Sequence, residues 1–298
     1  MKVLKGFAVA ILSLILFLLL PIFATVFMAN QTILNPDFVV TELNRLEIGP
    51  LAGEIVSEQL PPDYELLADV ISETIAEVEP WVKEQAGAAI HASYDYLMGR
   101  SQRLELVISL EQVKVVLKEK LRAAAVESLP PVLEGLPPSQ IELYLEETIQ
   151  GIDAQIPSRF EFSQDDLDSF LGRGTLEQVR EYLGYYRIGY MGLIGLILLL
   201  ILGIVLVYRE VRSPTRALGI TFLLSGGLLY AGIFFARDFV GTEITGLIPV
   251  DISGQLNEWL LGLWANLLSP PRMLSIGLLA GGVALLIVSF VYRPRLED

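Results

Sequence analysis

Four long apolar segments divide the sequence. Hydrophobic residues run almost without charge through Gly6–Ala29, Ile188–Tyr208, Ala217–Ala236 and Met273–Tyr292. Each segment holds about 20 residues, and at about 1.5 Å rise per residue this length matches a hydrocarbon core about 30 Å thick. The pattern predicts four membrane-spanning helices, with a large polar segment between the first and the second.

Basic residues between the apolar segments predict the orientation. They are Lys2, Lys5, Arg209, Arg212, Arg216, Arg293 and Arg295. All of them fall on one side if each apolar segment crosses once, and short loops rich in Lys and Arg stay in the cytoplasm. Both termini are therefore predicted to be cytoplasmic. Residues 30–187 and the loop 237–272 are then outside.

The first span is interpreted as an uncleaved anchor. Its 24 apolar residues exceed the roughly 7–15 of a signal-peptide core, and Phe27 stands where a cleavage site requires a small residue. A cleaved signal peptide is the alternative. The chain has no cysteine, which together with the N-terminal anchor favours the cytoplasmic (inner) membrane of a prokaryote.

The polar segment between the first two spans is predicted to be helical. Apolar residues recur at helical spacing in 36–46, 51–60, 63–78, 80–98, 109–126 and 139–149. Pro80 is expected to separate the third and fourth of these helices. Residues 103–108 and 159–162 alternate instead, and each is followed by a serine that caps a helix, so they are expected to pair as a small two-stranded ribbon.

The fold class predicted from these patterns is mainly α. It is a four-span α-helical membrane bundle with a helical extracytoplasmic domain, containing the small ribbon, inserted between spans one and two. The predicted domains are an anchor at 1–29, an acidic helical domain at 30–187, and a three-span bundle at 188–298. The bundle includes an outer interfacial amphipathic helix at 253–268.

The predicted outer domain is strongly acidic. It holds 28 of the 35 acidic residues and 12 of the 21 basic ones, a net charge of −16. Such a domain repels nucleic acid and anionic lipid headgroups, so no nucleic-acid partner is expected. A solvated helical surface explains most of this charge, while attraction of cations or of a basic partner is the alternative.

Aromatic residues are predicted to mark the membrane interface. Helical residues continue without a strong breaker from Leu176 to Tyr208, a length of roughly 50 Å. Within this helix Tyr182, Tyr185, Tyr186 and Tyr190 lie where an aromatic belt belongs. The long helix is expected to serve as an anchor, although it can also transmit movement from the outer domain to the membrane.

The loop between spans three and four carries an amphipathic pattern. Its apolar residues are Leu256, Trp259, Leu260, Leu263, Trp264, Leu267 and Leu268. With two tryptophans and one charge, the helix 253–268 is predicted to lie flat in the membrane interface, anchored by Trp259 and Trp264. The alternative is that its apolar face docks under the acidic domain.

Small residues in the spans predict close helix packing. Gly277 and Gly281 are four residues apart in span four, as are Gly227 and Ala231 in span three. This spacing lets helix backbones approach each other. Packing within the four-helix bundle is the first interpretation, and self-association into a homo-oligomer through span four is the second.

Few residues suggest catalytic chemistry. His91 is the single histidine, and the four acids Glu161, Asp165, Asp166 and Asp168 lack the glycine and glutamate spacing of a calcium loop. Acids favoured at a helix N-terminus account for them, with a bound cation as the alternative. An ion pathway normally requires ionisable groups within the membrane, and the middles of the spans hold none. No catalytic residue, cofactor or metal is therefore predicted, and the protein is expected not to be an enzyme.

The order of one span, a large outer domain and three further spans resembles the topology of the FtsX family of cell-division permease-like proteins. That resemblance implies coupling to an ATPase, but Met1–Lys5 and Arg209–Arg216 are too short for a coupling helix. The favoured hypothesis is a non-enzymatic membrane protein whose outer domain binds or senses a protein partner, or acts structurally in an envelope complex. An accessory subunit of a transport or export machine is the alternative.

Overall fold

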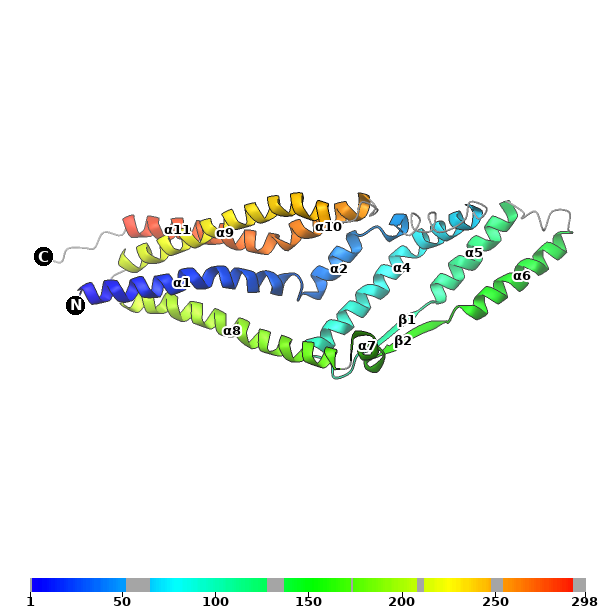
Figure 1. Ribbon diagram of the computed structural model, residues 1–298, viewed down its shortest axis with the longest axis horizontal. Coiled ribbons are helices and arrows are strands. Elements are labelled where there is room, and N and C mark those ends of the chain that lie inside the picture. The colour runs from blue at the N-terminus through cyan, green and yellow to red at the C-terminus, as the bar shows by residue number, and fades with distance from the viewer. Residues whose placement is uncertain are drawn as a thin grey trace. The chain divides into compact units, whose positions relative to one another are not determined.

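The computed structural model describes residues 2–51, 65–127, 137–172, 174–207, 212–247 and 254–291. In these ranges the chain is mostly helical (Figure 1). The helices are α1 (Lys2–Gln31), α2 (Pro36–Arg45), α4 (Glu65–Leu97), α5 (Glu111–Glu127), α6 (Pro138–Gln155), α7 (Gln164–Leu171), α8 (Thr175–Val207), α9 (Arg212–Leu247), α10 (Gly254–Leu267) and α11 (Ser269–Val291). The strands are β1 (Glu105–Ser109) and β2 (Arg159–Ser163).

Four helical segments among the described residues are long and apolar enough to cross a membrane. They are Lys5–Gln31, Thr175–Val207, Ser213–Arg237 and Leu256–Val291. This confirms the four predicted spans by length and composition, and it indicates a multi-pass membrane protein. The predicted unbroken helix into the second span is confirmed as well, because α8 runs without interruption from Thr175 to Val207.

The chain divides into two compact units. Unit 1 comprises 1–38, 182–252 and 260–298, and unit 2 comprises 39–181 with 253–259. The domain limits inferred from hydropathy, 30 and 187, stay a prediction. The predicted helix 51–60 beyond Leu51 and the basic residues Arg209, Arg293 and Arg295 lie outside the described residues.

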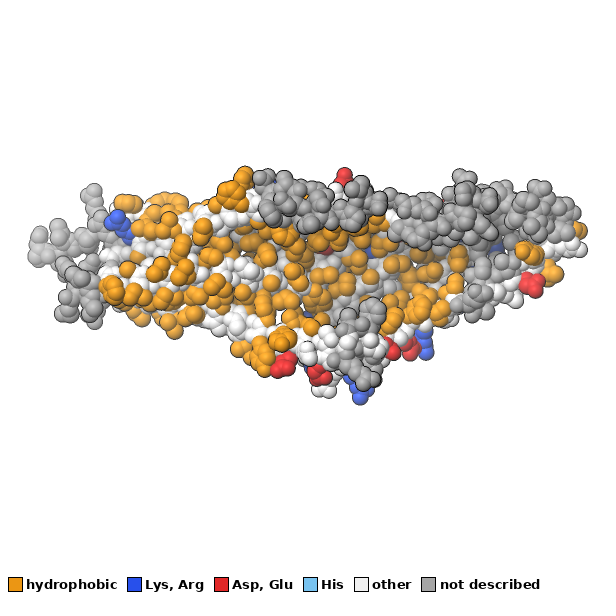
Figure 2. Space-filling view, in the orientation of Figure 1, with side chains coloured by type: hydrophobic (Ala, Val, Ile, Leu, Met, Phe, Trp, Pro, Cys, Tyr) orange, Lys and Arg blue, Asp and Glu red, His pale blue; other side chains and the backbone are white. Residues whose placement is uncertain are grey.

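Unit 1 is held together by apolar contacts among α1, α8, α9 and α11. Its buried residues are Val9, Leu16, Leu20, Ile197, Leu200, Ile204, Leu218 and Leu278. Elsewhere the same helices expose large apolar side chains, and Figure 2 shows hydrophobic side chains gathered over them. An inward apolar seam with an equally apolar outward surface is what hydrocarbon surroundings allow.

Unit 2 is built around α4, which packs against α5 and β1. Tyr96 at the end of α4 forms a small core with Leu104 and Leu176, and the Arg180 guanidinium lies 5.0 Å from the centre of the Tyr96 ring. The helix ends at Leu97, and Gly99 just beyond it has a φ of 73°, which suits glycine. There the Arg100 N–H donates to the Asp95 carbonyl at 2.8 Å, closing the last turn.

The predicted break at Pro80 is wrong. Helix α4 continues through this residue from Glu65 to Leu97. A proline inside a helix removes one hydrogen bond and costs about 3 kcal/mol, so contacts on both sides must offset it. Val78 and Thr74 before the proline are buried, and Glu79 with Lys83 ties the following turn to another segment. Tertiary contacts here outweigh the local preference.

The ribbon predicted from alternation is confirmed. β1 and β2 pair antiparallel, with Leu106 opposite Phe162 and Ile108 opposite Phe160. The helix start predicted after β2 is confirmed too: the Ser163 hydroxyl accepts from the Asp166 N–H at 3.3 Å, while the Ser163 N–H donates to the Asp166 carboxylate at 2.9 Å. This capping box fixes the strand end and the start of α7.

Candidate functional site

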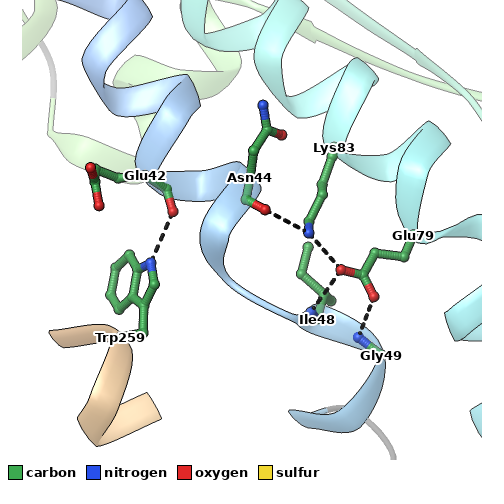
Figure 3. Close-up of polar contacts among 7 residues, drawn as sticks. All are labelled: Glu42, Asn44, Ile48, Gly49, Glu79, Lys83 and Trp259. Atoms are coloured by element: carbon green, nitrogen blue, oxygen red, sulfur yellow. Dashed lines mark hydrogen bonds and ion pairs between the residues drawn. The ribbon is translucent and has the colours of Figure 1, made fainter. Parts of the chain in front are cut away.

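A polar junction in unit 2 joins α4 to the segment that follows α2 (Figure 3). The Glu79 carboxylate accepts hydrogen bonds from the backbone N–H groups of Ile48 at 3.2 Å and Gly49 at 2.9 Å. Ile48 and Gly49 begin a new helical turn, whose free N–H groups favour an anion. Glu79 therefore caps this turn from a neighbouring helix.

Lys83 completes the junction. Its Nζ lies 2.6 Å from Glu79 Oε1 and donates to the Asn44 carbonyl at 2.9 Å, near the end of α2. Burial by itself raises the pKa of Glu79, but the hydrogen bonds from Lys83, Gly49 and Ile48 outweigh it and hold the pKa below its usual value. The carboxylate is thus kept charged, which favours a structural latch over a proton-transfer role.

Trp259 reaches the same segment from α10. Its indole Nε1 donates to the backbone carbonyl of Glu42 at 2.9 Å (Figure 3), and Glu42 is only 4% exposed. The Glu42 carboxylate lies 3.1 Å from Arg45 Nη1. Within unit 2, Trp259 thus takes part in a protein contact, while docking of the apolar face of the helix stays an untested alternative. Its predicted role in the membrane interface stays a prediction.

The other predicted interface residues lie in unit 1. The Tyr186 hydroxyl donates to the Val26 carbonyl at 2.6 Å, and the Tyr190 ring stacks on Phe23 with centroids 6.2 Å apart. These two tyrosines join α8 to α1, whereas Tyr185 is 62% exposed. Trp264 Nε1 is buried and has no hydrogen-bond partner in the described part of the chain. A function for these residues at the membrane surface stays a prediction.

The glycines that bring α9 and α11 together are not those singled out by spacing. A Cβ atom on Gly282 would lie 2.9 Å from the Gly219 carbonyl oxygen, and one on Gly226 would lie 3.0 Å from the Ser275 carbonyl oxygen. By contrast, open space lies above Gly277 and Gly227, and a Cβ on Gly281 would meet Phe222 at an ordinary 3.8 Å. Ala231 is exposed. Self-association through span four stays a prediction.

Two of the four clustered acids are engaged by the protein itself. Glu161 forms an ion pair with Arg159 at 2.7 Å, and Asp166 caps α7. The hydrogen bonds from Ser163 lower the pKa of Asp166. Among the residues that the structure describes, no three His, Asp or Glu side chains gather in an arrangement that could hold a metal ion. His91 is exposed on α4.

The ribbon carries the most distinctive surface of unit 2. Directly opposite residues share a face of an antiparallel pair, so Leu106, Ile108, Phe160 and Phe162 lie on one face. Leu106 packs against the core of unit 2, but Phe160 is 46% exposed and Phe162 is 39% exposed. Their rings stack with centroids 6.2 Å apart. We call these two residues the aromatic pair.

Sequence reasoning found the strand that carries the aromatic pair but did not single out its exposure. Alternation indicates which residues share a face, and it does not show whether the second strand has a covering element. Comparison with known proteins adds no functional information: no protein family model, no curated protein and no solved structure matches this chain.

Proposed function

We propose that this chain is a non-enzymatic, multi-pass membrane protein whose acidic unit 2 lies outside the cytoplasmic membrane and binds a protein partner. The observation that carries the proposal is the aromatic pair, Phe160 and Phe162, left half exposed on a two-stranded ribbon. Exposed aromatic clusters on polar domains are typical of interaction surfaces.

The size and charge of this surface indicate the kind of partner. The exposed parts of two phenylalanines amount to on the order of 150 Å², worth about 4 kcal/mol at most when covered. The aromatic pair is therefore an anchor that needs further contacts around it. Because residues 30–187 carry a net charge of −16, we infer a partner with basic residues around an apolar centre.

A site-specific photo-crosslinker tests this proposal in native membranes. Placed at Phe160 in the full chain, it is expected to trap one protein with a basic surface, and raising the salt from about 50 mM to about 200 mM should reduce the yield. Phe162→Ser should reduce it as well. The control position is Tyr182, which is 70% exposed in α8. Equal yields at Phe160 and Tyr182, or products containing only this chain, would contradict the proposal.

The alternative is an accessory subunit of a transport or export machine. It is favoured by the apolar side chains that α8 exposes along its length, including Ile188, Leu199 and Leu206. Crosslinks from Leu199 to a permease, in the absence of any product from Phe160, would support this alternative.

A further inference from the structure

A groove runs between α1 and α9 in unit 1. It has a volume of about 500 Å³ and is lined almost entirely by apolar atoms. Half of the lining residues are small: Gly6, Ala10 and Ser13 on α1, with Ala217 and Thr221 on α9. No side chain projects from Gly6, and a Cβ added there would meet nothing within 4 Å. The space above α1 is therefore open.

The groove continues into the hydrocarbon-facing surface. Leu14, Ile220 and Leu224 also line it and are 58%, 43% and 59% exposed. All three belong to segments long and apolar enough to cross a membrane. Whatever occupies the groove is accordingly apolar along most of its length.

Positive charge marks one end of the groove. Lys5 directly precedes Gly6 on α1, and Arg216 directly precedes Ala217 on α9. Both helices begin at the same end of unit 1 (Figure 1), so the two cations lie at the same end of the groove. Both residues are exposed, and neither forms an ion pair within the described residues.

We propose that this groove binds one anionic phospholipid, with an acyl chain between α1 and α9 and the phosphate between Lys5 and Arg216. Basic side chains at the end of a gap between membrane helices are suited to an anionic headgroup. The charge complementarity distinguishes this occupant from a transmembrane helix, which would fill the apolar groove without needing the two cations. The proposal does not depend on a partner for unit 2.

Lipid titration of the purified full chain in detergent, followed by native mass spectrometry, tests the proposal. The probes are phosphatidylglycerol and phosphatidylcholine with identical acyl chains. We expect phosphatidylglycerol to bind about 30-fold more tightly, about fivefold for each basic residue. Lys5→Gln combined with Arg216→Gln should abolish this preference while leaving phosphatidylcholine binding unchanged.

A second variant tests the groove. Gly6→Leu places a side chain in the open space and should weaken the binding of both lipids, because the leucine would occupy the volume proposed for the acyl chain. The matched controls are Arg187→Gln with Arg272→Gln, two exposed basic residues away from the groove lining, and Gly189→Leu on α8, where space is also open. These controls should retain both the affinity and the preference of the unmodified chain.

Several results would overturn the proposal. They are equal affinity for the two lipids, loss of the preference in the arginine controls, and unchanged binding in Gly6→Leu. Displacement of phosphatidylglycerol by millimolar inorganic phosphate or glycerol phosphate would reveal a phosphate site without a lipid site. A lipid-free dimer that Gly6→Leu dissociates would assign the groove to a second copy of the chain.

Discussion

At the scale of single residues, Glu79 and Lys83 show how two side chains can define a junction. They are four residues apart on α4, a spacing that usually gives an exposed pair worth a few tenths of a kcal/mol. Here both side chains are largely buried, at 16% and 17% exposed. Each also bonds to the backbone of the segment around residues 44–49, so the pair fixes the end of one helix and the start of another.

We therefore expect Glu79→Gln to destabilise this junction. Hydrogen bonds to a charged group are worth about 1.5–3 kcal/mol, so the loss should be about 2 kcal/mol at about pH 7. Hydrogen exchange of the full chain in detergent should then be about 30-fold faster at the amides of Ile48 and Gly49. The control is Glu84→Gln, which changes an exposed carboxyl on the same helix. Similar exchange rates at the amides of Ile48 and Gly49 in the two variants would show that Glu79 does not stabilise this junction.

The same junction predicts a pH dependence. The pKa of Glu79 is lowered from its ordinary value of 4.5, so its stabilisation is fully present above that pH and disappears as the pH falls through the lowered pKa. The difference in exchange between the unmodified chain and Glu79→Gln should narrow on acidification below about pH 4.5. A difference that grows with acidity would show that the carboxyl is protonated in the folded chain.

At the scale of helices and strands, the sequence predicted features that depend on neighbouring residues better than features that depend on tertiary contacts. Asn35 accepts from the Asp37 N–H at 3.1 Å and Ser163 caps α7, both at positions indicated by residue type. The uninterrupted α4 was not predictable from Pro80, because the contacts that offset its cost come from distant residues. Spacing likewise identified small residues in spans three and four but not which of them face each other, since several helix faces carry glycine.

The α9–α11 contact gives a direct prediction. Gly282→Ala would force a Cβ atom to within 2.9 Å of both the Gly219 carbonyl oxygen and Leu223 Cγ, so it should cost about 1–3 kcal/mol. Gly277→Ala meets open space and should be neutral, or stabilising by up to about 1 kcal/mol through helix propensity. Thermal unfolding in detergent compares them. Greater damage from Gly277→Ala would instead locate the close contact between copies of the chain.

The amphipathic helix α10 gives a second prediction at this scale. With Trp81 first changed to Phe, variants retaining only Trp259 or only Trp264 can be compared by quenching with doxyl-labelled lipids. The Trp259 indole donates to the Glu42 carbonyl within unit 2, so it should be quenched less than Trp264. Equally strong quenching of both would place the whole helix in the interface and would exclude the Trp259–Glu42 hydrogen bond in lipid.

At the scale of the whole molecule, hydropathy was sufficient to predict the four spans, because a candidate span is defined by its length and composition alone. The aromatic pair and the groove between α1 and α9 were not predictable in this way. Each depends on what neighbouring elements leave uncovered: within the described part of the chain Phe160 on β2 is 46% exposed, and Gly6 lies where α9 leaves space. The positions of basic residues, in contrast, can be identified directly in the sequence. They support both the proposed orientation and the proposed site for a lipid headgroup.

The orientation itself is the last prediction, and the absence of cysteine makes it accessible to single-cysteine labelling. Glu142→Cys and Gly254→Cys, at exposed positions in α6 and α10, should react with a membrane-impermeant maleimide in intact cells. Lys5→Cys and Arg216→Cys should react only after permeabilisation, because basic flanks of the spans remain in the cytoplasm. Labelling of Glu142→Cys only after permeabilisation would invert the topology and would remove unit 2 from the outside. The proposal of a lipid-binding groove would still hold after that result, because it requires only that Lys5 and Arg216 lie at the same end of the groove.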